Sequence, residues 1–219
     1  MYSLVRLVPQ PPPAPGPVVA AFDVDHTLTT RDCVVPFLRR AAGWRLVTAL
    51  GRHPLATAGA ALRRDRDRLK ELACASLRGA EGAAIDGLGR DFAGEIAAEW
   101  LRDDTAARLR WHRKLGHTVL LASASLDAYL LPLGESLDVD DVICTTLERG
   151  ADGTLTGRLA GANCRGAEKA RRVREWLAAH DLATAELWAY GDSPGDAPLL
   201  DLAAHPVWVN RDRLPPEPG

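Results

Sequence analysis

The sequence lacks an excess of charge of either sign. Its 219 residues include 27 Lys and Arg against 29 Asp and Glu, so the net charge is only −2. A protein that binds the phosphate backbone of nucleic acids needs a strong basic field or patch. We therefore expect no nucleic acid partner.

Paired cysteines are also lacking. The four cysteines stand far apart and form no CxxC pair: Cys33, Cys74, Cys144 and Cys164. This spacing argues against a zinc site and against a tight disulfide framework. Reduced thiols are typical of the cytoplasm, and we expect the protein to be cytoplasmic.

The beginning of the chain has no long hydrophobic run. Residues 1–17 contain one Arg and the stretch PQPPPAPGP, with no apolar segment long enough for a signal peptide or a membrane span. We expect residues 1–17 to form a disordered proline-rich leader, and we expect no stable membrane insertion. The sequence carries no signal for an oligomeric state.

The most informative stretch that is present is FDVDHTLT, residues 22–29. The apolar run 18–22 predicts a buried strand, and two carboxylates, Asp23 and Asp25, follow at its end. Side-chain alternation relaxes where a chain leaves a strand, so both acids can face one pocket. Such a pair can bind a metal or supply a carboxylate nucleophile. Taken alone, the pattern also fits a solvated strand end with a turn-capping Asp.

Later segments repeat this design. The apolar runs 118–122 and 186–190 also end in small or acidic polar residues, and a lysine opens a helical pattern between them. In an open parallel α/β sheet, ligands bind outside the carboxyl ends of the strands. We therefore expect these polar residues to converge with the two acids: Ser123, Ala124, Lys169, Asp192 and Asp196.

In order and approximate spacing, these residues resemble the four motifs of the haloacid dehalogenase-like hydrolases. The likeness runs from about residue 18 to residue 210 and is strongest to the phosphoserine phosphatase-like branch, subfamily IB. The phrases SASLDAYLLPL, DGTLTGRL and GANCRGAEK resemble that branch as well. The resemblance implies an α/β fold with a Rossmann-like, doubly wound parallel sheet and an inserted α-helical cap.

The periodicity agrees with this organisation. Residues 33–104 show helical periodicity without a convincing strand and form the expected cap, tied to the core by hinges near Asp32 and Asp104. Residues 18–32 and 105–213 form the expected core, with a helix over 197–203 and a hairpin whose turn is Asp152-Gly153. The mixed charges of residues 62–70 predict a solvated helix face.

The resemblance also implies a role for each motif residue. Asp23 attacks phosphorus, and Asp25 protonates the departing alkoxide and then activates water. A Mg²⁺ ion is held by Asp23, Asp192 and the backbone carbonyl of Asp25, while Asp196 holds it through water.

Further roles concern the substrate. Ser123 and the amide of Ala124 bind the phosphoryl oxygens, and Lys169 pairs with the phosphoryl group and with the nucleophile. Thr27 orients the loop of the first motif. Asp32 stands nine positions after the nucleophile, where phosphoserine phosphatases carry the acid that recognises the substrate amine.

The expected function is therefore Mg²⁺-dependent hydrolysis of a small phosphorylated metabolite through an aspartyl phosphate, with a phosphoserine-like ester as one candidate. Two alternatives stay open: transfer of the phosphoryl group to an alcohol, and binding of a phosphate ligand without catalysis. A calcium loop is excluded because Leu28 stands where that loop needs Gly. Dehalogenase sites lack the second acid of the first motif, and Asp25 is present.

Overall fold

The computed structural model describes residues 16–63, 65–209 and 214, so nearly all of the predicted leader lies outside the described residues. Its centre is a five-stranded parallel sheet in the order β3-β2-β1-β6-β7. The strands are β1 (Val18–Phe22), β2 (Thr118–Leu126), β3 (Asp141–Thr145), β6 (Glu186–Gly191) and β7 (His205–Trp208). The predicted doubly wound parallel sheet is confirmed.

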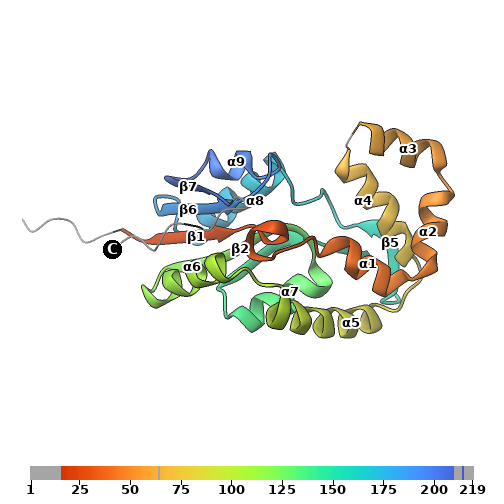
Figure 1. Cartoon of the computed structure of the whole chain (residues 1–219), viewed down its shortest axis with the longest axis horizontal. Coiled ribbons are helices and arrows are strands. Elements are labelled where there is room, and N and C mark those ends of the chain that lie inside the picture. The colour runs from red at the N-terminus through yellow and green to blue at the C-terminus, as the bar shows by residue number, and fades with distance from the viewer. Residues whose placement is uncertain (1–15, 64, 210–213, 215–219) are drawn as a thin grey trace, which may run out of the picture.

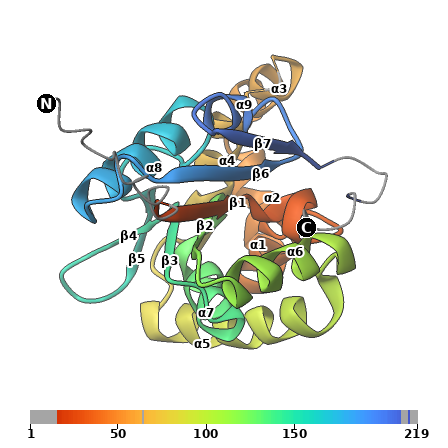
Figure 2. The ribbon, with the colours of Figure 1, turned by 90° about the vertical axis from the view of Figure 1, so that its left-hand side faces the viewer.

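Helices cover both faces of the sheet, as Figure 2 shows. Val19 and Ala21 of β1 face the buried cluster that includes α8 (Ala167–Ala179) and α9 (Ala197–Leu200). Ala20 and Phe22 face the opposite cluster, which includes α6 (Asp103–Lys114) and α7 (Asp127–Leu137). Because both faces are buried at the centre of the sheet, β1 and residues 119–122 of β2 are continuous apolar runs that do not alternate with polar residues.

The expected helix over 197–203 ends early, at Leu200. The backbone N–H groups of Leu202 and Ala203 donate to the carbonyls three residues back, Leu199 and Leu200. This tighter pattern closes the chain into a turn that leads to β7.

The cap segment, residues 33–104, is helical as expected. It contains α1 (Val34–Ala42), α2 (Trp44–Gly51), α3 (Pro54–Leu62), α4 (Arg66–Cys74), α5 (Gly82–Glu95) and a π-helical turn (Ile96–Trp100). Gly43, with φ +54°, separates α1 from α2, and Pro54 starts α3. Figure 1 shows α2, α3 and α4 at the opposite end of the molecule from β7.

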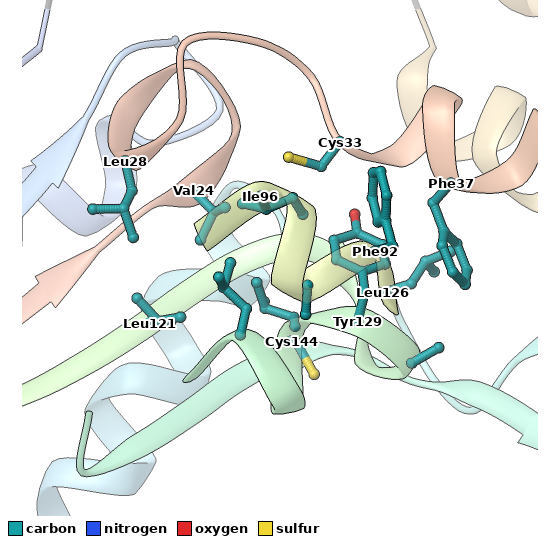
Figure 3. Close-up of a cluster of buried hydrophobic side chains, with 14 of the residues drawn as sticks. Val24, Leu28, Cys33, Phe37, Phe92, Ile96, Leu121, Leu126, Tyr129 and Cys144 are labelled. Atoms are coloured by element: carbon teal, nitrogen blue, oxygen red, sulfur yellow. The ribbon is translucent and has the colours of Figure 1, made fainter. Parts of the chain in front are cut away.

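Helix α5 packs against α7 of the sheet layer and not only against the other cap helices. Figure 3 shows Phe92 and Ile96 among the buried side chains of this region, beside Tyr129 and Leu126. The cap segment is therefore joined to the core along a whole helix as well as at its two ends.

The hairpin predicted from Asp152-Gly153 is present as β4 (Leu147–Arg149) and β5 (Leu155–Leu159). It reaches across to the cap segment, because Gly79 N donates to Leu155 O (2.7 Å) and Leu155 N donates to Ala80 O (2.8 Å). Within the described ranges, the structure contains no helix with the length and hydrophobicity needed to cross a bilayer.

Candidate active site

The strand register sets the position of the first motif. Phe22 of β1 is aligned with Leu121 of β2 on one side and Tyr190 of β6 on the other. The next residue, Asp23, donates its backbone N–H to the Tyr190 carbonyl (2.9 Å). The chain passes from β1 to β2 on one side and later returns to β6 on the other, so Asp23 lies at the topological switch point.

Strand β2 continues beyond its expected end at Ala122, as far as Leu126. Ala122 is aligned with Ile143 and Leu126 with Thr145, so β2 advances four residues against two on β3. This bulge frees residues 123–125 from regular pairing while the chain stays extended. Ser123 lies there, almost fully buried, and its hydroxyl accepts a hydrogen bond from Ser125 N (3.2 Å).

The chain after Asp23 forms a tight irregular turn, Val24–Leu28. His26 has φ +63°, a left-handed conformation that is uncommon outside glycine. Thr105 of α6 anchors the turn by donating its hydroxyl to the Thr27 carbonyl (2.9 Å). The turn thus holds Asp25 in place, while the predicted role of Thr27 in orienting it stays a prediction.

Asp23 is bonded to Lys169. The buried ammonium of Lys169 donates to Oδ1 of Asp23 (2.7 Å) and to Oδ1 of Asp196 (2.5 Å). Burial raises the pKa of Asp23 and Asp196 raises it further, while the charge of Lys169 opposes the shift. Burial alone would lower the pKa of Lys169, but attraction to the two carboxylates raises it above its ordinary value. The lysine is therefore held charged beside the first acid.

Asp196 is oriented by its own turn. Its Oδ2 accepts hydrogen bonds from the backbone N–H (3.1 Å) and the hydroxyl (2.8 Å) of Ser193. The neighbouring Gly191 has no room for a side chain, because a Cβ there would lie 2.5 Å from the Cβ of Asp196. Both oxygens of Asp196 are thus engaged within the protein.

Three carboxylates gather at this point and could bind a metal. Oxygens of Asp23, Asp192 and Asp196 lie within 4.8 Å of one another. Burial raises the pKa of Asp192, and the charges of the other two acids raise it further. A set of hard oxygen donors with one compensating lysine fits Mg²⁺. The expected division into direct ligands, Asp23 and Asp192, and a ligand through water, Asp196, stays a prediction.

The second acid, Asp25, is held by two donors. Its Oδ1 accepts from Cys33 N (2.8 Å), and its Oδ2 accepts from the hydroxyl of Ser125 (2.9 Å). Tyr129 in turn donates its hydroxyl to Ser125 (2.8 Å). Burial, followed by the charges of Asp23 and Asp32, raises the pKa of Asp25 to about 6. A carboxyl that exchanges a proton near neutral pH suits a general acid and base.

Sequence reasoning assigned no role to Ser125 or Tyr129. Ser125 is the second serine of the strand end, and Tyr129 follows it by four residues, near the start of α7. The four-residue spacing weakly indicates that Ser125 and Tyr129 lie together. It does not identify Asp25, the acid that they orient, which stands 100 positions before Ser125.

Lys70 was also missed, and the expectation of a solvated face over residues 62–70 is wrong for it. Lys70 is 8% exposed. Its ammonium donates to the Ala124 carbonyl and to Oδ1 of Asn163 (3.0 Å), which also accepts from the Thr145 hydroxyl (2.7 Å). The last charged position of the run is buried because α4 places it against the end of β2 at Ala124. Burial lowers the pKa of Lys70.

Asp32 lies at the start of α1. Its Oδ2 accepts from Val35 N (2.9 Å), which satisfies one of the free N–H groups of the first helical turn. Its charge also acts on Asp25. The predicted contact with a substrate amine stays a prediction.

Comparisons with known proteins agree with this geometry. The family model of haloacid dehalogenase-like hydrolases matches residues 20–201. The chain is 37% identical over 188 residues to the protein CicA of Caulobacter vibrioides, covering 85% of this chain and 83% of CicA. It is 29% identical over 208 residues to the phosphoserine phosphatase SerB1 of Mycobacterium tuberculosis, covering 92% and 67% of the two chains.

Solved structures show the same fold. A protein of unknown function from Bordetella pertussis Tohama I superposes with a TM-score of 0.65 at 25% identity. The superposition covers 85% of this chain and 87% of the other. The family model, which matches residues 20–201, spans the strand ends that carry all four motifs.

Proposed function

Because the chain belongs to the haloacid dehalogenase-like hydrolases, we propose that it is a Mg²⁺-dependent phosphatase that hydrolyses a small phosphorylated metabolite. The similarity to a relative named phosphoserine phosphatase supports this class and makes a phosphoserine-like ester one candidate substrate. The proposed location is the cytoplasm. The observation that carries the proposal is the arrangement of two buried acids, one bonded to a lysine and the other held by two neutral donors.

Asp23 is the proposed nucleophile. Its Oδ1 is held by Lys169, which leaves Oδ2 to attack the phosphorus atom. The new O–P bond forms as the ester O–P bond breaks, and an aspartyl phosphate results. Lys169 keeps its charge throughout and offsets the negative charge that gathers between carboxylate and phosphate.

Asp25 is the proposed acid and base. In the first step, its proton moves to the departing alkoxide. In the second step, the carboxylate takes a proton from the water that attacks phosphorus, and Asp23 is released with inorganic phosphate. The raised pKa of Asp25 and its fixed orientation by Cys33 N and Ser125 support both steps.

The remaining motif residues bind the phosphoryl group. Ser123 and the backbone N–H of Ala124 are proposed to hydrogen-bond its oxygens from the freed end of β2. Thr27 is proposed to orient the turn that presents the acids. Mg²⁺, held by Asp23, Asp192 and the Asp25 carbonyl, would supply positive charge to the phosphoryl oxygens when bound.

Phosphate release from a panel of phosphorylated metabolites and aryl phosphates tests the proposal. We expect activity with Mg²⁺, loss with a chelator, and no turnover in Asp23→Asn, whose amide is a poor nucleophile of the same shape. Asp25→Asn should lose about 10² to 10⁴ in rate. Small and equal losses in both variants would contradict the assigned roles, and added alcohols that divert the phosphoryl group would indicate a transferase.

The substrate class is tested at Asp32. If its carboxylate binds a substrate amine, Asp32→Asn raises KM for amino-bearing phosphoesters and leaves amine-free analogues nearly unchanged. An equal effect on both esters would mean that Asp32 serves only the start of α1.

A further inference from the structure

The outer surface of the cap segment is unusually apolar. The four most exposed large hydrophobic side chains among the described residues all lie on α2 and α3: Leu55 (88%), Leu62 (88%), Trp44 (75%) and Val47 (72%). We call these four residues the outer cap face. Leu55 and Leu62 are seven positions apart and lie on one side of α3, while Trp44 and Val47 are three apart on α2.

The charged residues near the outer cap face in the sequence are arginines. Residues 33–64 contain six Arg and no Asp or Glu, although the whole chain has a net charge of −2. Helix α3 itself has no charged residue, and the exposed Arg52 and Arg63 flank its two ends. Within residues 43–63 the formally charged side chains are therefore all arginines, while Asp65 and Asp67 stand at the start of the next helix, α4.

The threonine hydroxyl groups of α2 and α3 form hydrogen bonds within the protein. Thr48 donates to the Arg45 carbonyl (3.0 Å), and Thr57 donates to the Leu50 carbonyl (2.9 Å). A specific protein interface carries about one hydrogen bond per 100–200 Å² and needs polar groups to form them. Exposed apolar side chains with arginines at both ends of α3 fit a partner that offers hydrocarbon beneath anionic groups.

We propose that the outer cap face docks on an anionic lipid surface. Leu55, Leu62 and Trp44 enter the boundary between headgroups and acyl chains, and the flanking arginines contact lipid phosphates. The contact is peripheral, because α2 and α3 are far shorter than a membrane span.

The docking surface is separate from the candidate active site. Figure 1 shows α2 and α3 at the end of the molecule remote from β6 and β7. Helix α3 packs against α4, and Lys70 of α4 donates to Ala124 near the end of β2. Docking therefore leaves the strand ends free, and variants of the outer cap face leave the site residues unchanged.

Vesicle flotation with the full chain tests the proposal. The probes are vesicles of phosphatidylcholine alone and of phosphatidylcholine mixed with phosphatidylglycerol. We expect binding to the mixed vesicles, weaker binding in high salt, and little binding to phosphatidylcholine alone. Leu55→Glu/Leu62→Glu should weaken binding at least about tenfold, since two buried side chains are lost from the contact. Arg52→Gln should weaken it about fivefold, because one attractive charge is lost.

Leu115→Glu is the matched control, because Leu115 is an exposed leucine outside the cap segment, and it should bind like the wild type. Circular dichroism checks that each variant is folded. The proposal is overturned if the wild type fails to float with the mixed vesicles, or if the control loses as much binding as the double variant. It is also overturned if sedimentation shows that the double variant dissociates a dimer, because the face then joins two copies of the chain.

Discussion

Replacing Gly89 by alanine should separate α5 from α7. A Cβ built on Gly89 would lie 1.9 Å from the carbonyl oxygen of Ala128 and 2.5 Å from its carbonyl carbon. These are backbone atoms of α7, so no side-chain rotation can relieve the clash. Ordinary contact begins near 3.4 Å, and α5 would have to retreat by about 1.5 Å.

The cost can be estimated from the packing. Overpacked core sites usually lose about 1–3 kcal/mol, and a rigid backbone neighbour favours the upper end of that range. Alanine regains about 1 kcal/mol of helix propensity over glycine. We therefore expect Gly89→Ala to lower the free energy of unfolding by about 2 kcal/mol.

Gly94→Ala in the same helix is the matched control. A Cβ on Gly94 meets no atom within 4 Å, so this variant should be stabilised by up to about 1 kcal/mol. Urea unfolding followed by circular dichroism measures both. If Gly89→Ala were as stable as Gly94→Ala, the close contact between α5 and α7 would be refuted.

Two further predictions concern buried polar groups. His112 is buried against Tyr190 (2.8 Å), and burial, followed by the charges of His117 and Arg108, lowers its pKa to about 3. The unfolded chain binds that proton near pH 6.5, so stability should fall as pH drops below 6.5, by about 1.4 kcal/mol per unit. His112→Asn should remove this part of the slope in unfolding curves at pH 6.5 and about 5; an unchanged slope would contradict it. Lys70 holds the carbonyl of Ala124, whose N–H is proposed to bind the phosphoryl group, so Lys70→Met should raise KM for phosphoesters about tenfold with a smaller change in kcat. Arg68→Met, at an exposed neighbour on α4, should change neither; equal effects of both variants would contradict this role of Lys70.

The residues that gather at the strand ends could be predicted from the sequence, but the residues that lie over them could not. Asp23 and Asp192 each follow a contiguous apolar run, and parallel strand ends meet at one edge, so short-range patterns predict their convergence. Lys70 meets Ala124 across 54 positions, inside a run of charges that looks solvated. Its burial depends on how α4 lies over the core, which no local pattern encodes.

The packing partner of α5 could not be predicted from the sequence either. The apolar positions of α5, such as Phe92, recur with the same period whether the helix packs within a cap or against the sheet layer. Gly89 could have indicated that another helix packs closely on α5, but a glycine within a helix does not show which helix that is.

The packing of α5 on α7 changes which part of the chain can move. Asp104, one of the two expected hinges, accepts hydrogen bonds from Thr105 N (2.9 Å) and Leu214 N (3.0 Å) and pairs with Arg102. A swing of the whole segment 33–104 would break the bond from Leu214 N and the buried contacts of α5. Only α1–α4 could lift without moving α5, and this motion would separate Phe37 of α1 from Phe92 and Tyr129 and break the Lys70 contacts. The part of the chain free to open over the site is therefore smaller than the insertion, and the packing of Phe37 opposes its opening.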